Sequence, residues 1–203
     1  MFVQIVQGKV RDPQAARAEL DRWADELART GVGLLGATAG VTADGQFINV
    51  ARFESEEAAR ENNAQPAQAA WWAETAELFD GRPTFAESSD VTVDVVGDPD
   101  QAGFVQVIQE RVTDTARARE LMSQDSGEWN AFRPDVLGSL SAAHDDGRWT
   151  TVIWFTSEAE ARENEAKEMP ESMRAAMEEM ASITEGEPTY LDLNEPWLLT
   201  PGR

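Results

Sequence analysis

The segment FVQIVQGKVRD, from Phe2 to Asp12, decides the fold because the chain contains it in two versions. It returns as FVQVIQERVTD from Phe104 to Asp114, an offset of 102 residues. Both versions are rich in Val, Ile and Phe, which favours a β-strand. A repeat at this period predicts two copies of one structural unit in a single chain.

The same offset holds further along the chain. Leu35-Gly36 recurs as Leu137-Gly138, and Ala59-Arg60-Glu61-Asn62 recurs as Ala161-Arg162-Glu163-Asn164. Chance similarity does not keep one register through several elements. We therefore infer the duplication and fusion of one unit of about 100 residues, which is long enough for a compact domain.

The offset lengthens toward the end of each copy. Pro83-Thr84-Phe85 corresponds to Pro188-Thr189-Tyr190, an offset of 105 residues. The second copy therefore carries three extra residues, which we expect in a loop near Thr184 to Gly186.

Each copy has the pattern of a β-α-β-β-α-β unit. In the first copy a helix is expected to start at Asp12-Pro13 and to end before Gly31, because apolar residues recur at helical spacing from Ala16 to Leu27. Asp44-Gly45 predicts a hairpin, and Pro66 interrupts the second helix. The expected strands are 2–10, 34–41, 46–53 and 84–96, and the parts of the second helix are 56–64 and 67–79.

This order of elements predicts an α+β fold of two ferredoxin-like units, each with both helices on one face of an antiparallel sheet. The other face of a Val-rich sheet needs a partner, and the fused second copy can supply it. We therefore expect the two sheets to close into an intramolecular α+β barrel and the protein to be a monomer. The Gly- and Pro-containing segment 97–100 is the expected linker between a first domain, 1–99, and a second domain, 100–203.

The composition limits the partners and the kinds of site. The 203 residues carry 38 acidic and 17 basic side chains, a net charge of −21, so we expect neither nucleic acid nor a membrane surface as a partner. The absence of Cys excludes disulfides, thiolate metal sites and cysteine nucleophiles. The opening MFVQIVQGKV lacks the basic start and long apolar run of a secretory signal, which favours a cytoplasmic protein.

The strand-to-helix segment Phe53-Glu54-Ser55-Glu56-Glu57-Ala58-Ala59 resembles that of the antibiotic biosynthesis monooxygenase family of dimeric α+β barrel proteins. The resemblance covers nearly all of both halves, and the chain is similar to a tandem-fused member. It implies the barrel architecture, and two branches of the family suggest where a site would lie.

The haem-degrading branch is not matched. Its members use an Asn late in the first strand, a Trp in the second helix and a His further along, and none of these residues is kept here. Without an axial His we expect no haem, and we expect no other cofactor. The corresponding residues are Gln7, Asn62 and Trp71 or Trp72 in the first half, and Gln109, Asn164 and Met173 or Arg174 in the second.

The branch that forms polyketide quinones is matched at one residue. Its members are similar in using an Asn in the third strand, a Trp four residues later, and a Tyr and an Arg from the second helix. Asn49 matches the Asn, whereas Phe53 stands at the Trp position and Ala59 at the Tyr position. In the second half Thr151 replaces the Asn. The resemblance implies that Asn49 is the catalytic residue of a cofactor-independent oxygenation in the first half.

The adjacent Trp71 and Trp72 point about 100° apart on a helix and cannot both belong to one narrow buried stripe. With an offset of 102 residues, Trp71 corresponds to Met173, the first residue of a stripe that continues with Met177 and Met180. This alignment predicts that Trp71 is a core residue. Trp72 either lines a ligand pocket or widens the core.

Uncharged polar residues recur on otherwise apolar elements. Gln7 and Asn62 return as Gln109 and Asn164. Buried amides need hydrogen-bond partners. They either satisfy backbone groups at the bend before Pro66 and across the barrel, or they orient a ligand as the few polar groups of an apolar cleft.

Three functional interpretations stay open. The first is an enzyme that oxygenates a small aromatic or polyketide-type molecule beside Asn49; the second is a binding protein without turnover, and the third is a protein whose side chains fill the cleft. His144, the only histidine, has neither a metal partner nor a nucleophile and is interpreted as a turn residue. The predicted ligand-binding residues are Gln7, Phe53, Asn62, Trp72, Gln109 and Asn164.

Overall fold

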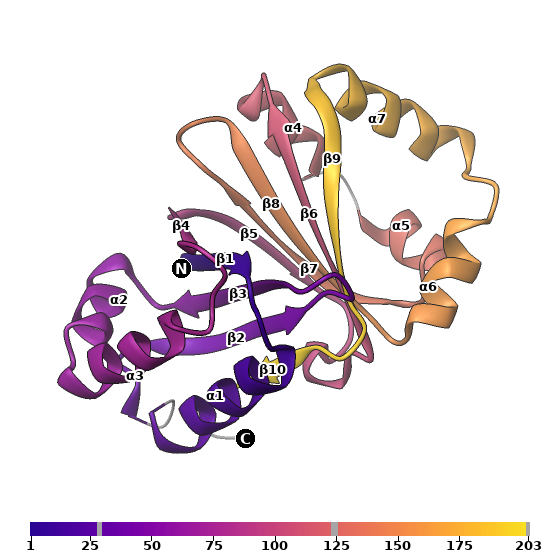
Figure 1. The fold of residues 1–203 in the computed structure, drawn as a ribbon. Coiled ribbons are helices and arrows are strands. Elements are labelled where there is room, and N and C mark those ends of the chain that lie inside the picture. Colours follow the sequence, from indigo (N-terminus) through magenta and orange to yellow (C-terminus); the bar gives the residue numbers. More distant parts are fainter. Residues whose placement is uncertain (28–29, 123–125, 202–203) are drawn as a thin grey trace. The chain divides into compact units, whose positions relative to one another are not determined.

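A computed structural model describes residues 1–27, 30–122 and 126–201, and Figure 1 follows the chain through its elements. The strands and helices alternate twice in the expected order. The strands are β1 Phe2–Lys9, β2 Leu34–Val41, β3 Gln46–Phe53, β4 Thr84–Ser88, β5 Asp90–Val95, β6 Phe104–Val112, β7 Val136–Ala143, β8 Arg148–Phe155, β9 Thr184–Leu193 and β10 Trp197–Leu199. The helices are α1 Pro13–Glu26, α2 Glu56–Asn63, α3 Pro66–Ala76, α4 Thr115–Met122, α5 Ser126–Phe132, α6 Glu158–Glu165 and α7 Glu171–Ser182.

The chain divides into two compact units that differ from the two sequence repeats. Unit 1 comprises Met1–Val91 and the C-terminal segment from Glu195, and unit 2 comprises Thr92–Asn194. Strand β5 belongs to the first repeat but lies in the sheet of unit 2, and β10 belongs to the second repeat but lies in the sheet of unit 1. The chain therefore passes from one unit to the other at residues 91–92 and 194–195, and the expected linker at 97–100 lies within unit 2.

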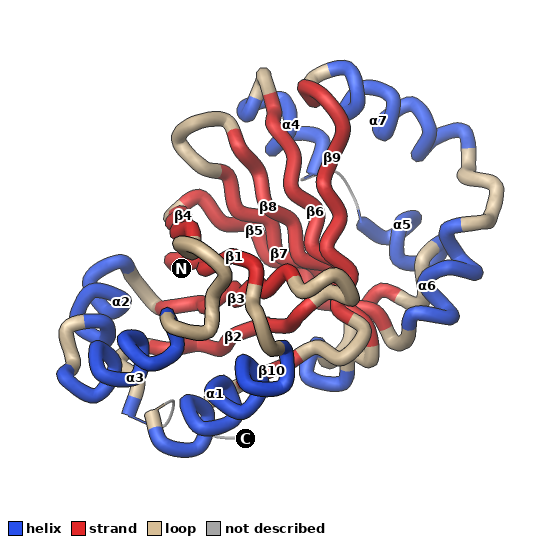
Figure 2. Tube along the Cα trace, viewed as in Figure 1, coloured by secondary structure: helices blue, strands red, loops and turns tan. Residues whose placement is uncertain are grey.

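Unit 1 contains an antiparallel sheet in the order β10-β2-β3-β1-β4. Helices α1, α2 and α3 lie along one face of it (Figure 2). Local sequence signals fix the helix starts: an Asp12 side-chain oxygen accepts from the backbone N–H of Gln14 and Ala15, and Ser55 caps α2 in the same way. Pro66 occupies the first turn of α3, where no backbone N–H is needed.

Unit 2 repeats this arrangement with the sheet order β5-β7-β8-β6-β9. Ser157 caps α6 as Ser55 caps α2. Ala161 of α6 packs against Phe104 of β6 and Phe155 of β8. These two side chains therefore lie on the helix-facing side of the sheet.

A glycine admits the added edge strand in each sheet. A Cβ at Gly36 would lie 2.7 Å from the backbone oxygen of Leu199 in β10, and a Cβ at Gly138 would lie 2.7 Å from that of Asp94 in β5. Real Cβ atoms do not approach backbone oxygens this closely. Gly36 and Gly138 are equivalent positions of the repeat, so the same substitution-sensitive contact occurs once in each unit.

The expected single strand over 84–96 is divided in the structure. β4 ends at Ser88 and pairs with β1, whereas β5 begins at Asp90 and pairs with β7. The hydroxyl oxygen of Ser88 accepts a hydrogen bond from the Asp90 N–H at 3.0 Å, and this local turn redirects the chain. The sequence prediction of one long strand is therefore wrong at this point.

The three extra residues of the second copy lie between its last two helices. Ala64 ends α2 and is followed directly by Gln65, the N-cap of α3. Between Ala166, which ends α6, and Pro170, the N-cap of α7, the chain has three more residues, 167–169. The expected position at the start of β9 is therefore wrong, and the offset is 105 residues throughout α7.

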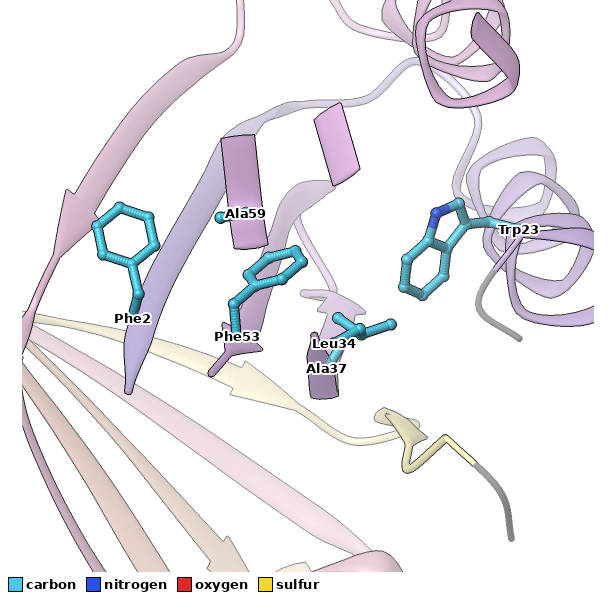
Figure 3. Close-up of a cluster of buried hydrophobic side chains, with 6 residues drawn as sticks. All are labelled: Phe2, Trp23, Leu34, Ala37, Phe53 and Ala59. Atoms are coloured by element: carbon cyan, nitrogen blue, oxygen red, sulfur yellow. The ribbon is translucent and has the colours of Figure 1, made fainter. Parts of the chain in front are cut away.

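The core of unit 1 is built from large side chains on the helix-facing side of the sheet. Phe2 and Phe53 lie side by side on neighbouring strands, and Trp23 points from α1 toward them and Leu34 (Figure 3). Each such side chain contributes roughly 1.5–3 kcal/mol when it is fully buried. The structure thus confirms the α+β class and the two ferredoxin-like units; closure into one barrel and the monomeric state stay predictions.

Candidate functional site

A cavity of about 370 Å³ lies inside unit 2, between its helices and the helix-facing side of its sheet. β5, β7 and β8 contribute from the sheet, and α4, α5 and α7 contribute from the helix layer. The sequence analysis placed the site in the first half of the chain and did not predict a cavity in unit 2.

Two hydroxyl groups on the sheet side of the cavity contact each other. Ser141 of β7 and Thr151 of β8 are directly paired in register, and their side-chain oxygens lie 3.0 Å apart. Ile153 and Phe155 continue the same side of β8 and also line the cavity. A hydroxyl both donates and accepts, so the pair can present either function to a ligand.

The opposite wall is mostly apolar and comes from α7. Met173, Ala176, Met177 and Met180 line the cavity, and Trp129 of α5 adds an aromatic face. Met173 is buried, whereas Met177 is 48% exposed and lies where the cavity meets solvent. Methionine side chains are flexible and polarizable, which suits contact with flat apolar molecules.

Among the described residues, the charged ones that line the cavity are Arg133, Glu128 and Asp94. Arg133 donates from Nε and Nη2 to the carboxylate of Asp135, at 3.0 and 2.7 Å. Glu128 accepts a hydrogen bond from the Ser172 hydroxyl at 2.8 Å. Asp94 lines the cavity from β5.

The helix alignment explains why the two units differ at this place. With the offset of 105 residues, Trp71 and Trp72 of α3 correspond to Ala176 and Met177 of α7. Gln68 and Met173, which correspond under the same offset, are both 8% exposed, in agreement with this alignment. Two bulky indoles in unit 1 are thus replaced by smaller side chains in unit 2.

The indole rings of unit 1 take part in its packing. Trp71 contacts both core clusters of unit 1, and its Nε1 donates to the backbone oxygen of Glu19 at 3.1 Å. Trp72 packs against Phe79 and, edge-on, against Phe85, with ring centroids 6.1 and 5.3 Å away. Both tryptophans are half-buried, so the predicted contrast between a core Trp71 and a separate Trp72 is not seen in their burial.

Asn49 lies on the helix-facing side of β3, paired in register with Val6 and Ala39. Its Oδ1 is buried and has no hydrogen-bond partner within the described residues. Gln7 pairs with Ile48, the neighbour of Asn49, and therefore points to the opposite face of the sheet. The structure does not bring Gln7 and Asn49 together on one face of unit 1.

The two recurring asparagines are buried and bonded to nearby groups. Asn62 accepts from the Val32 backbone N–H at 3.2 Å, and Asn164 donates to the Glu160 backbone oxygen at 2.7 Å. The Asn164 side-chain oxygen also accepts from the Lys167 ammonium. Their predicted role in orienting a ligand stays a prediction.

The remaining predicted residues are spread over two environments. Phe53 is 2% exposed in the unit 1 core. Gln109 pairs with Thr150 and points away from the side of β8 that carries Thr151 and the cavity. Thr151, the counterpart of Asn49 in the repeat, lines the cavity, so the family position that the sequence singled out borders a cavity in unit 2.

His144 occupies the predicted turn position after β7. Its backbone N–H bonds to the Arg148 oxygen at 2.8 Å, and its Nε2 lies 3.2 Å from the Thr150 hydroxyl. In the described ranges no group of three or more His, Asp or Glu side chains is arranged to hold a metal ion.

Several cavity residues had no signal in the sequence. Ser139 and Ser141 occupy alternate positions of β7, a pattern that many strands with one polar face share. Arg133 and Asp135 lie in a loop, where charged residues are common. The available signal was the stripe Met173, Met177 and Met180, which the sequence did reveal and which lines the cavity.

Comparisons with known proteins identify the fold. Over 99% of this chain, the structure matches a candidate monooxygenase from Lactobacillus acidophilus NCFM, of which 96% is covered, with a TM-score of 0.74 and 12% identity. A candidate monooxygenase from Fusobacterium nucleatum subsp. nucleatum matches over 98% of this chain and 94% of its own, with a TM-score of 0.76 and 10% identity.

An anthrone oxidase-like protein matches over all of this chain and 94% of its own, with a TM-score of 0.71 and 12% identity. The sequence matches no family model and no curated protein. The structural matches confirm the monooxygenase-like ferredoxin fold that the resemblance implied. No helix within the described ranges is long and apolar enough to cross a membrane.

Proposed function

We propose that the protein binds a small aromatic molecule in the cavity of unit 2 and oxygenates it without a cofactor. The observation that carries the proposal is the cavity itself: about 370 Å³, walled by methionines and a tryptophan, with the Ser141–Thr151 hydroxyl pair on its sheet side. Small-molecule sites are commonly concave and apolar with a few placed polar groups.

The dimensions favour a ligand of two or three fused rings. Ligand sites span roughly 300–1,000 Å³, and this cavity is near the lower limit. Met177 and Trp129 offer flat, polarizable surfaces, whereas the hydroxyl pair offers one polar contact. A rigid, largely apolar ring system with few polar substituents is complementary to these walls.

The proposed reaction uses the electrons of the substrate itself. A ring CH₂ group that is conjugated with a carbonyl of the same ring system loses a proton, and the resulting carbanion reduces O₂. The CH₂ becomes a C=O with one oxygen atom of O₂, and the other oxygen atom leaves as water with the two hydrogens of the CH₂. The protein contributes desolvation and orientation, and the Thr151 and Ser141 hydroxyls are polar groups beside the bound substrate. The three structural relatives are described as candidate monooxygenases and as an anthrone oxidase-like protein, which supports an oxygenation of this class.

A second candidate site rests on Asn49. A buried amide oxygen without a partner in the described part of the chain is costly, and a ligand hydroxyl would satisfy it. Under this alternative, a phenol or enol binds in unit 1 beside Asn49 and Trp72, as the sequence resemblance implies.

Binding is tested by fluorescence titration with 1-naphthol. Ala176→Trp places in unit 2 the residue that unit 1 has at the equivalent position, and we expect it to weaken binding by at least about tenfold because the indole fills the cavity. The matched control, Ala175→Trp, alters the neighbouring exposed position and should bind as the wild type does. Unchanged binding by Ala176→Trp contradicts the proposed site.

Turnover is tested separately with an oxygen electrode and anthrone as the probe. We expect oxygen uptake above the uncatalysed rate, one O₂ per anthrone, and its loss in Ala176→Trp. Binding without added uptake would leave the non-catalytic binding protein as the remaining interpretation.

A further inference from the structure

Arg133 is a cationic side chain held almost entirely out of solvent at the cavity. It follows α5, is 8% exposed, and lines the cavity. Its guanidinium carbon lies 5.4 Å from the ring centre of Phe155, which lines the same cavity. A buried arginine needs a partner to offset its desolvation, and Asp135 supplies it.

The ion pair fixes the guanidinium plane. Nε and Nη2 donate in parallel to the two oxygens of Asp135, a bidentate geometry. The backbone on both sides is anchored as well, because the Arg133 N–H bonds to Trp129 and the Asp135 carbonyl accepts from Thr156. The donor group is therefore preorganised before any ligand arrives.

The pair leaves hydrogen-bonding capacity unused. A guanidinium carries five N–H donors, two of which are on Nη1. Within the described residues, Nη1 of Arg133 has no hydrogen-bond partner. A donor in this position, rigid and largely shielded from water, favours an oxygen acceptor from the ligand.

The local charges indicate that this acceptor is neutral. Asp135 already neutralises Arg133, and Asp94 and Glu128 place two further carboxylates at the cavity. The net charge of −21 adds long-range repulsion of anions. A carbonyl oxygen takes the hydrogen bond without this penalty.

We propose that Arg133, locked by Asp135, is a specificity-determining residue that donates from Nη1 to a neutral carbonyl oxygen of the ligand. The inference rests on the proposed function, because it assumes that the ligand occupies the unit 2 cavity. It is particular to unit 2: the repeat places Gly31 and Gly33 at the equivalent positions of unit 1.

The test compares two probes that differ by one oxygen, 1-tetralone and tetralin, by isothermal titration calorimetry. For the wild type we expect 1-tetralone to bind about tenfold more tightly, the ratio that one hydrogen bond to a charged donor supports. If neither probe binds, the proposed function fails. If both bind equally, the cavity is a ligand site but the role of Arg133 is contradicted.

The double variant Arg133→Met/Asp135→Leu removes both charges together and leaves neither one unpaired. We expect it to bind tetralin as the wild type does and to lose the preference for 1-tetralone. The control Arg174→Met, an exposed arginine of α7, should keep that preference. A retained preference in the double variant overturns the proposal and assigns the carbonyl to the Ser141–Thr151 pair.

Arg133→Lys is the second variant if the double variant does not fold. A lysine keeps a charge for Asp135 but lacks the fork that holds a second donor toward the ligand. The preference for 1-tetralone should therefore fall here too, and an unchanged preference contradicts the proposal.

Discussion

Glu110 carries a half-buried carboxyl group on the helix-facing side of β6, in register with Trp149. Burial disfavours its ionised form and raises its pKa above the ordinary value, and a hydrogen bond from the Thr184 hydroxyl partly opposes this shift. Because the folded state holds the proton more tightly than the unfolded chain does, folding is favoured most below the ordinary pKa of a glutamate. Stability is lost as pH rises through the raised folded pKa.

Glu110→Gln should therefore raise the free energy of unfolding at pH 7 relative to the wild type, since a neutral amide carries no charge to desolvate. The gain should shrink at pH 4, where the wild-type carboxyl is itself protonated in the fold. Urea unfolding at both pH values measures the difference. A variant that is less stable than the wild type at pH 7 would show that the carboxylate makes a needed contact.

Truncating Trp71 should lower the stability of unit 1 more than truncating Trp72. Its indole contacts both core clusters and bonds to Glu19, so Trp71→Ala should lower the free energy of unfolding by roughly 3–5 kcal/mol. Trp72, which packs against the 59% exposed Phe85, should cost less when truncated. Urea denaturation of the two variants gives the order, and the reverse order would contradict the assignment of Trp71 to the core.

Among the elements, β5 depends on close approach to β7. In Gly138→Ala the new Cβ would meet the Asp94 backbone oxygen at 2.7 Å, so β5 must move away. Thr92, Asp94 and Val96 of this segment line the cavity, and we expect 1-naphthol affinity to fall together with thermal stability.

Gly97→Ala is the control for this substitution. Its Cβ would come within 2.7 Å of Cδ2 of Leu137, the end of a flexible side chain that can rotate away, and would lie at an ordinary contact distance of 3.6 Å from the Leu137 Cα. Binding that is equally weakened in both variants would mean that the position of β5 does not control the cavity.

The repeated elements could be predicted from local signals, because each signal acts within a few residues. Asp12 and Ser55 cap the helices that follow them directly in the sequence, whatever the tertiary structure around them. The apolar residues from Phe2 onward likewise favour a strand through their own side chains. The exchange of β5 and β10 between sheets could not be predicted. Either edge offers the same backbone groups, and the choice depends on the turn at Ser88 and on long-range pairing.

The site was harder to predict than the fold because a cavity is defined by missing volume. Asn49 and Trp72 were conspicuous as residues, whereas Ala176 is informative only through the indole that it lacks. The fixed offset of 102 residues aligned Trp71 with Met173 and concealed this difference. The helix caps at Gln65 and Pro170 reveal the corrected alignment, and the equal burial of Gln68 and Met173 agrees with it.

For the whole molecule, the strand exchange makes each unit depend on the other repeat. A chain divided near residue 100 leaves β5 with the first half and β10 with the second, so each half lacks the edge strand of its own sheet. We expect the separate halves to be insoluble or to associate, and the intact chain to be a monomer of 22.3 kDa by light scattering. Soluble, folded, monomeric halves would contradict this dependence.

The central claim is that unit 2 provides the ligand site, and a crystal structure of the protein with 1-tetralone bound tests it most directly. We predict the ring system between Met177 and Thr151, with its carbonyl oxygen within hydrogen-bond distance of Nη1 of Arg133. A ligand found instead beside Asn49 and Trp72 in unit 1, with the unit 2 cavity empty, would contradict the claim.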